Sequence, residues 1–97
     1  MAKGYWIGHI DIANMEPYRD YIPASAKAIA QYDGRFLVRG GKSDNVEGDA
    51  RSRHVIVEFP SYARAVECYQ SPEYAKARAI RRSNSQGDVV IVEGLPD

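Results

Sequence analysis

The sequence predicts an α+β fold with the element order β-α-β-β-α-β in a single domain, residues 1–97. Two observations support this prediction. Four short runs rich in β-branched and aromatic residues alternate with two segments of helical periodicity. The stretch Arg53–Tyr74 then reads as a strand, a proline stop, a helix, a second stop and the start of another helix. A chain of this length forms one modest core, and small domains often bury further surface by forming oligomers.

The first third of the chain is expected to supply one strand and one helix. Residues Lys3–Ile12 are mostly aromatic and β-branched, which is typical of a strand. Asn14 is a candidate helix cap, and apolar residues then recur at spacings of three and four as far as Tyr32. Pro23 lies inside this pattern and is expected to kink the helix without ending it. Asp33-Gly34 supplies the stop.

The centre of the chain predicts two strands joined by a long loop. Arg35–Gly40 is the expected second strand, and the glycines at its end permit a bulge or bend. The polar residues Lys42–Ser52 read as a hairpin loop, in which Val46 is a candidate for a short extra strand. Arg53–Phe59 is the expected third strand, and Pro60 ends it because proline cannot donate to the ladder.

The last third is expected to hold a broken helix and a fourth strand. Ser61 caps the first part, and Ser71-Pro72 combines a cap with a proline at the first helical position, so the helix restarts there. Asn84–Asp88 reads as a polar turn and Val89–Glu93 as the fourth strand. Two split β-α-β units of this kind predict a ferredoxin-like antiparallel sheet of order 4-1-3-2, with both helices on one face.

Alternation divides the strand residues between two sheet faces. The face expected under the helices is apolar: Trp6, Ile10, Ile12, Phe36, Val38, Val55, Val57, Phe59, Val90 and Val92. The opposite face is mixed: Tyr5, Ile7, His9, Asp11, Leu37, Arg39, His54, Ile56, Glu58, Val89 and Ile91. Because this second face is too apolar for an open, water-facing sheet, it predicts a homodimer in which two such faces pack together.

The ionisable residues of the second face form the candidate site. Antiparallel pairing is expected to bring His9, Asp11, Arg39 and His54 to one end of the sheet and Glu58 toward the other. In an enzyme, either histidine is a candidate acid/base catalyst oriented by Asp11 or Glu58, and Arg39 is a candidate for binding an anionic group. The alternative is that these residues are ion pairs lining the dimer interface.

Other side chains give weaker signals. Tyr69 and Tyr74 are candidates for substrate binding if their hydroxyls line a pocket between helix and sheet, where Gly8 leaves room; the alternative is that they are core or rim aromatics. The histidine and carboxylate spacing matches no metal motif, so no metal is expected. No glycine-rich phosphate loop, nucleophile elbow or CxxC pair is present, and no cofactor is expected.

Composition excludes several classes of function. Thirteen Lys and Arg balance thirteen Asp and Glu, and this net charge of zero argues against binding to nucleic acid or to an anionic membrane. An RNA-recognition module of the same element order stacks bases on aromatic residues of its third strand, where this chain offers His54, Ile56 and Glu58. Cys68 is the single cysteine, so no intrachain disulfide forms. With no signal peptide or membrane-spanning stretch, a cytoplasmic protein is expected.

Several sequence blocks together resemble the family called domain of unknown function 1330. The blocks are Gly4-Tyr5-Trp6-Ile7, Gly34-Arg35-Phe36-Leu37-Val38-Arg39-Gly40-Gly41, Val46-Glu47-Gly48, Glu58-Phe59-Pro60-Ser61, Tyr69-Gln70-Ser71-Pro72-Glu73-Tyr74 and Val90-Ile91-Val92-Glu93-Gly94. The resemblance implies a ferredoxin-like subunit paired into a dimeric α+β barrel. Members of that superfamily include cofactor-independent monooxygenases, muconolactone-type isomerases and haem-degrading enzymes.

One departure from the family pattern bears on the site. The family often places an aromatic residue after the Glu-Gly of the hairpin loop, whereas this chain continues Asp49-Ala50-Arg51. If that aromatic closes a pocket, the closure differs here. Two hypotheses therefore stay open. One is a small dimeric enzyme, monooxygenase- or isomerase-like, acting without a cofactor on a small organic acid or aromatic compound. The other is a non-catalytic dimer that binds a metabolite or has a structural role.

Overall fold

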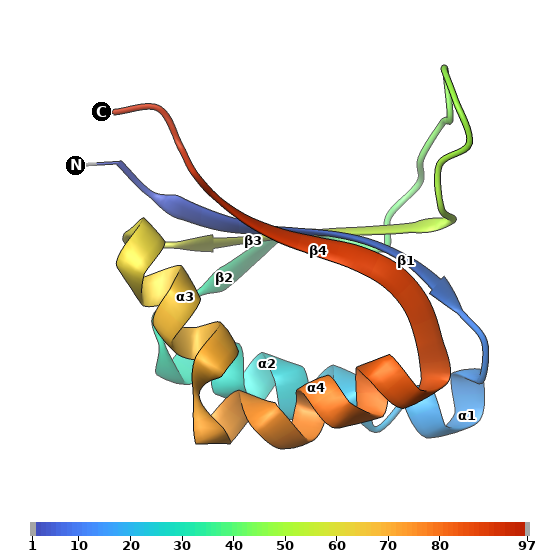
Figure 1. Cartoon of the computed structure of the whole chain (residues 1–97), viewed down its shortest axis with the longest axis horizontal. Helices are drawn as coiled ribbons and strands as arrows, with labels where there is room; N and C mark the ends of the chain where they lie inside the picture. Colours follow the sequence, from blue (N-terminus) through green and yellow to red (C-terminus); the bar gives the residue numbers. More distant parts are fainter. Residues whose placement is uncertain (1, 97) are drawn as a thin grey trace.

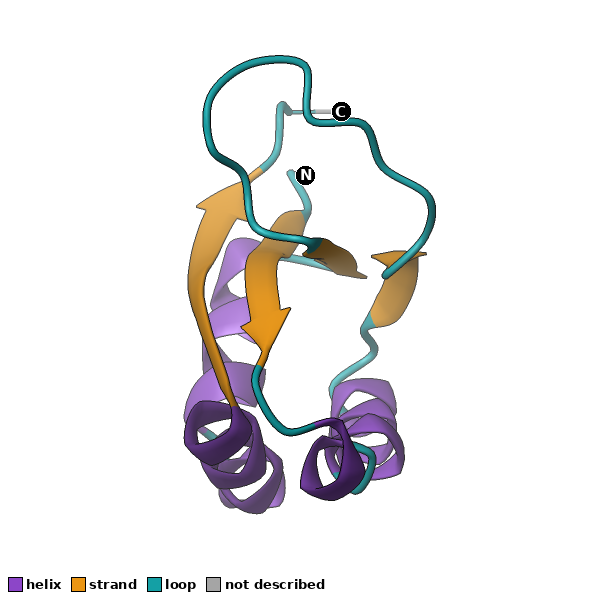
Figure 2. Ribbon diagram, turned by 90° about the vertical axis from the view of Figure 1, so that its right-hand side faces the viewer, coloured by secondary structure: helices purple, strands orange, loops and turns teal. Residues whose placement is uncertain are grey.

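The computed structural model describes residues 2–96 as an antiparallel four-stranded sheet with all of its helices on one face (Figure 1). The elements are β1 (Gly4–Ile12), α1 (Met15–Tyr18), α2 (Tyr21–Gln31), β2 (Arg35–Arg39), β3 (Arg53–Phe59), α3 (Tyr62–Gln70), α4 (Pro72–Asn84) and β4 (Ser85–Glu93). The sheet order β2-β3-β1-β4 confirms the predicted ferredoxin-like topology. Figure 2 shows the same two layers from the side, with the loop between β2 and β3 arching away from the helices.

The first helical segment breaks at a different place from the one predicted. The chain leaves the helix at Arg19 and Asp20, and Pro23 occupies the first turn of α2. The prediction of a kink at Pro23 is therefore wrong. A proline is tolerated in a first turn because the backbone N–H groups there have no intrahelical acceptor. Asp33, not Gly34, adopts the left-handed conformation that ends α2, with φ of 66°.

The second helical segment breaks where predicted. The Ser61 hydroxyl accepts a hydrogen bond from the Arg64 backbone N–H at 3.1 Å and caps α3. The Ser71 hydroxyl accepts one from the Tyr74 backbone N–H, also at 3.1 Å, and Pro72 begins α4. These caps satisfy N–H groups that a helix start otherwise leaves without a partner. Because α4 begins at Pro72, Tyr74 lies in the core and is only 1% exposed.

The predicted polar turn over Asn84–Asp88 and the predicted extra strand at Val46 are both wrong. Helix α4 continues to Asn84, and β4 begins at Ser85, paired with Ile12 of β1. Gly87 lets the two backbones approach, because a Cβ there would collide with the carbonyl oxygen of His9. No strand forms in the described hairpin loop, and Val46 is 82% exposed.

Strand β4 presents the opposite faces to those predicted. Trp6 pairs with Ile91 and Ile7 pairs with Val90, so Ile91 lies under the helices and Val90 on the opposite face. Val90 is 53% exposed and Val92 43% exposed, whereas Ile91 packs against the core. The prediction that Val90 and Val92 are core residues is wrong. We call the sheet side without helices the open face.

A register shift also reverses the faces of the residues at the end of β2. Phe36 pairs with Val57, but Val38 pairs with Ile56, so Leu37 forms a β-bulge. A bulge inserts one residue and reverses which side the following residues face. Val38 therefore lies on the open face, and Arg39, paired with Val55, lies on the helix side. Both placements differ from the predicted faces.

The core lies between the sheet and the helices. Trp6 packs at a tilt against Phe59 and edge-on against Tyr74, with ring centroids 5.1 and 4.9 Å apart, and its indole N–H donates to the Ala65 carbonyl at 2.9 Å. Cys68 is fully buried, and burial raises the pKa of its thiol to about 12, so the thiol stays protonated at neutral pH. Within residues 2–96, no helix has the length and hydropathy of a transmembrane segment.

Candidate functional site

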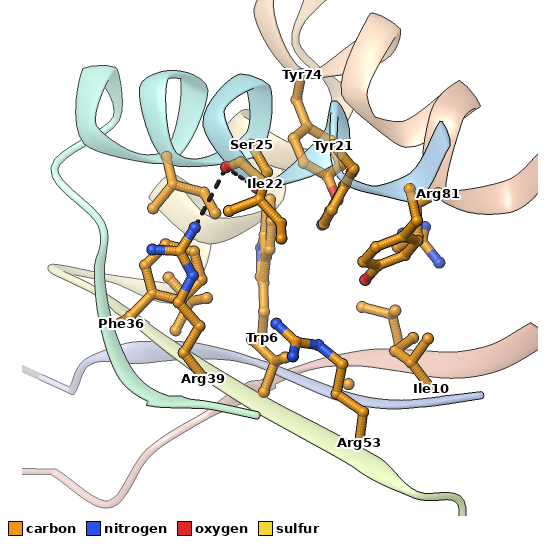
Figure 3. Close-up of a pocket in the computed structure, with 16 residues that line it drawn as sticks. Trp6, Ile10, Tyr21, Ile22, Ser25, Phe36, Arg39, Arg53, Tyr74 and Arg81 are labelled. Atoms are coloured by element: carbon orange, nitrogen blue, oxygen red, sulfur yellow. Dashed lines mark hydrogen bonds between the residues drawn. The ribbon is translucent and has the colours of Figure 1, made fainter. Parts of the chain in front are cut away.

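A pocket lies between the sheet and helices α2 and α4, beside the aromatic core (Figure 3). We call it the helix–sheet pocket. Its wall is formed by Trp6, Gly8, Ile10, Tyr18, Tyr21, Ile22, Ser25, Ile29, Phe36, Arg39, Arg53, Val55, Val57, Tyr74, Arg81 and Val89. The cavity is narrow, with a volume of about 40 Å³. A water molecule needs roughly 10–15 Å³ on this measure, so the pocket suits a small ligand.

Three arginines reach the pocket from three different elements. Arg39 ends β2 and faces inward because of the bulge at Leu37. Arg53 begins β3, and it packs so closely on Gly40 that a Cβ at Gly40 would collide with the Arg53 guanidinium. Arg81 comes from the last turn of α4 and is 7% exposed. The fold thus brings three cations to the wall of an aromatic cavity, with Arg39 and Arg81 on opposite sides of it (Figure 3).

These arginines lack carboxylate partners among the described residues. No Asp or Glu lines the helix–sheet pocket, and the ion pairs found within residues 2–96 involve other arginines. Arg39 donates to the Ile22 carbonyl at 3.3 Å and lies over the Phe36 ring at 4.2 Å. The Nε atoms of Arg53 and Arg81 are buried without a hydrogen-bond partner. Buried polar groups are normally paired, so these two nitrogens are free to donate to a ligand or to water that enters the pocket.

Three tyrosines add neutral donors to the same wall. The Tyr21 and Tyr74 hydroxyls are 2.7 Å apart and share a hydrogen bond. Burial raises the pKa of Tyr21, and the neighbouring Tyr74 raises it further. Burial also raises the pKa of Tyr74 and of Tyr18. All three phenols therefore stay protonated at neutral pH and can donate hydrogen bonds.

The pocket has the chemistry of an anion receptor. Burial lowers the pKa of Arg81, but the adjacent tyrosines outweigh burial and raise it overall, so Arg81 remains charged. Guanidinium and phenol groups donate hydrogen bonds, and the lining formed by residues 2–96 contains no histidine, carboxylate or thiol to accept a proton. Such a wall stabilises negative charge on a ligand's oxygen atoms, while the aromatic rings contact its apolar part.

Three of the four residues predicted to cluster at one end of the sheet, His9, Asp11 and His54, lie together on the open face. His9 and His54 are cross-strand partners, with Nδ1 atoms 2.8 Å apart. Asp11 and the two histidines line one cavity, and Asp11 accepts hydrogen bonds from Ser52 and Arg51. The prediction that Arg39 joins them is wrong, since it faces the opposite side of the sheet. Arg51 takes its place, 3.6 Å from Asp88.

The remaining predicted residues are separated from this cluster. Glu58 lies toward the other end of the open face, where it accepts hydrogen bonds from Arg35 at 3.0 Å and Tyr5 at 3.1 Å. Tyr74 lines the helix–sheet pocket. Tyr69 packs edge-on against Trp6, and its hydroxyl accepts a hydrogen bond from Arg81 at 3.2 Å. Within residues 2–96, no group of three or more His, Cys, Asp or Glu side chains is arranged to hold a metal ion.

Sequence reasoning missed Arg53, Arg81, Tyr18 and Tyr21 as pocket residues. A signal existed for two of them. Arg53 alternates with Val55, and Arg81 follows Tyr74 by seven residues, which is two helical turns. An arginine in phase with core residues on both a strand and a helix indicates a buried cation. The tyrosines carried no separate signal, because aromatic residues at helical spacing are ordinary core residues.

The comparisons with known proteins agree with this fold. The chain belongs to the family Domain of unknown function (DUF1330), whose model matches residues 3–95. A protein of unknown function from Rhodopseudomonas palustris has a similar structure, with a TM-score of 0.76 and 17% identity over 99% of this chain and 85% of that one. No curated protein matches the chain in sequence.

Two structures described as oxygenases share the fold. One is SnoaB, a cofactor-independent oxygenase from Streptomyces nogalater, with a TM-score of 0.66 and 7% identity over 100% of this chain and 97% of that one. The other is an antibiotic biosynthesis monooxygenase, with a TM-score of 0.51 and 14% identity over 99% of this chain and 100% of that one. At these identities the likeness establishes the fold alone.

Proposed function

We propose that the protein is a homodimeric enzyme that binds a small organic acid, phenol or enol as its anion in the helix–sheet pocket. The observation that carries this proposal is the pocket wall, with three arginines, three tyrosines and no carboxylate among the described residues. The two buried Nε atoms without partners match an anionic ligand. The narrow, aromatic cavity favours a flat and mostly apolar ligand body.

The reaction class follows from what the wall supplies. Donors alone stabilise an enolate or phenolate that binds already ionised, and such an anion can give its electrons to molecular oxygen and form a carbon–oxygen bond as a peroxide. The pocket supplies no base, so the best substrates are ionised in water before they bind. The fold shared with the two oxygenases supports oxygen addition by analogy. No tightly bound cofactor is required for this chemistry.

The second part of the proposal is the dimer. The open face carries Val38, Val90 and Val92 at 36%, 53% and 43% exposure, beside the part-buried Ile7 and Ile56. A second copy packing there would bury this apolar strip and form a dimeric α+β barrel. In this arrangement His9, His54, Asp11 and Glu58 belong to the interface side, and we place them outside the reaction.

The test is a substrate screen with variants chosen from the two sides of the sheet. Small aromatic acids, unsaturated acids and hydroquinones are incubated in air-saturated buffer, and turnover is followed by ultraviolet absorbance and oxygen uptake. Wild type is expected to turn over at least one compound, Arg39→Ala and Arg53→Gln to lose at least tenfold in kcat/KM, and His54→Ala to retain activity. Loss of activity in His54→Ala alone would move the reaction to the open face.

A non-catalytic binding protein is the second candidate, and the absence of a base in the pocket wall favours it. Its signature is different. Compounds bind in the helix–sheet pocket and depend on Arg53, but none is converted in air, even over many hours. Recovery of every bound compound unchanged by mass spectrometry would select this candidate over the enzyme.

A further inference from the structure

A second cavity adjoins the helix–sheet pocket where α4 meets β4. We call it the outer cleft, and its wall consists of Arg51, Tyr69, Arg81, Arg82, Ser85, Gln86, Gly87 and Val89. Two of these residues, Arg81 and Val89, also line the helix–sheet pocket. The outer cleft is polar and open, with a cavity volume of about 590 Å³. It differs in both respects from the narrow aromatic pocket beside it.

The charge on this wall is one-sided. Three arginines line the outer cleft, and none of its described lining residues is acidic. Arg51 forms ion pairs with Asp11 at 3.0 Å and Asp88 at 3.6 Å, two residues outside the cleft lining, and these offset part of its charge. Arg82 is exposed and takes part in none of the ion pairs found within residues 2–96. The cleft therefore keeps a net positive lining.

Arg81 is a buried charge that the fold alone does not explain. A cation in the last turn of a helix is favourable, but this benefit does not require burial. Arg81 is 7% exposed, donates a hydrogen bond to the Tyr69 hydroxyl at 3.2 Å, also interacts with the Tyr74 hydroxyl, and leaves its Nε unpaired. A buried guanidinium held by neutral hydroxyls alone keeps its charge and a free donor for an anion. An open, basic cleft on this residue gives an anion access to it.

We propose that the outer cleft is a second anion site that takes a small oxyanion, either a phosphate or a carboxylate, bound by Arg81 and Arg82. The Tyr69 hydroxyl and the Gln86 amide supply neutral polar groups on the same wall. Both ligand types present oxygen atoms that accept charge-assisted hydrogen bonds from guanidinium groups. Arg81 is shared with the helix–sheet pocket, whereas Arg82 belongs to the outer cleft alone, and the site requires no reaction in the helix–sheet pocket.

The experiment is a titration of isotope-labelled protein followed by nuclear magnetic resonance. Sodium phosphate and sodium acetate are added in separate arms, with ionic strength held constant by sodium chloride. Saturating shifts are expected at the backbone amides of Ser85, Gln86 and Gly87 in at least one arm. Arg82→Gln should weaken this binding about tenfold, which is the effect of losing one charge-assisted hydrogen bond. The arm that saturates identifies the ligand as phosphate-like or carboxylate-like.

Two control variants make the result decisive. Arg35→Gln removes the same charge at the opposite end of the sheet and should keep wild-type affinity. Arg53→Gln alters the helix–sheet pocket alone and should also keep it, so failure of the proposed function leaves this test intact. The proposal is overturned if neither anion shifts the cleft amides, or if Arg82→Gln and Arg35→Gln weaken binding equally.

Discussion

The arginines on the two sides of the sheet differ in whether they have a carboxylate partner. On the open face Arg35 pairs with Glu58 at 3.0 Å, and Arg51 pairs with Asp11 at 3.0 Å. On the helix side, Arg39, Arg53 and Arg81 surround an aromatic cavity and have no carboxylate partner among the described residues. Paired charges on an exposed strand contribute little beyond local order. Unpaired charges beside a cavity lower stability, and ligand binding is the simplest reason for a protein to retain them.

The largest expected effect comes from removing a buried charge. Arg81→Met should weaken binding of a small organic anion in the helix–sheet pocket by one to two orders of magnitude, because one or two charge-assisted hydrogen bonds are lost. Its free energy of unfolding should stay equal or rise by about 1 kcal/mol, since an apolar side chain replaces a buried charge that has only neutral hydroxyl partners. Calorimetric binding and urea unfolding measure the two quantities. A large loss of stability would show that Arg81 is structural.

Filling the pocket is the next largest effect. Gly8 lies on the pocket floor, and a Cβ there would meet only Val89 Cγ2 at 3.7 Å and the Val55 carbonyl oxygen at 4.0 Å. Gly8→Val should therefore fold and should weaken ligand binding at least tenfold, with a smaller effect for Gly8→Ala. Gly41→Val is the matched control, because Gly41 is exposed and a Cβ added there would meet no other atom within 4 Å. Unchanged binding in Gly8→Val would place the ligand elsewhere.

A change on the open face should separate the subunits without affecting the pocket. Val90→Glu puts a charge on the apolar strip, and light scattering at micromolar concentration should report a monomer mass where wild type gives a dimer. Val46→Glu, at a valine that is 82% exposed in the hairpin loop, should remain dimeric. A monomeric wild type would contradict the proposed interface.

The smallest expected effect is an acid-dependent loss of stability at the open face. Hydrogen bonds from the Ser52 backbone, the Ser52 hydroxyl and the Arg51 guanidinium hold the pKa of Asp11 below its usual value. This stabilisation is full above the unfolded-state pKa, near pH 4, and is lost as the pH falls through the lowered folded value. Asp11→Asn should flatten the decline in melting temperature below about pH 4. Asp20→Asn is the control.

The contrast between the two sides was only partly predictable from sequence. Proline stops, serine caps and strand alternation predicted the sheet order and the break at Ser71 because these signals are local. The bulge at Leu37 has no distinctive residue, so Arg39 was assigned to the wrong face. The faces of β4 were also reversed, because the continuous apolar run Val89–Val92 has no alternation and only pairing with β1 sets its register.

We propose that the ligand binds in the helix–sheet pocket, and not beside His9 and His54 on the open face. The most direct measurement is a fluorescence titration, because Trp6 is the single tryptophan and lines that pocket. A small aromatic acid such as benzoate should change Trp6 emission saturably, with affinity lowered at least tenfold in Arg53→Gln and unchanged in His54→Ala. The opposite ranking of the two variants, or a Trp6 signal that no aromatic acid alters, would contradict the account.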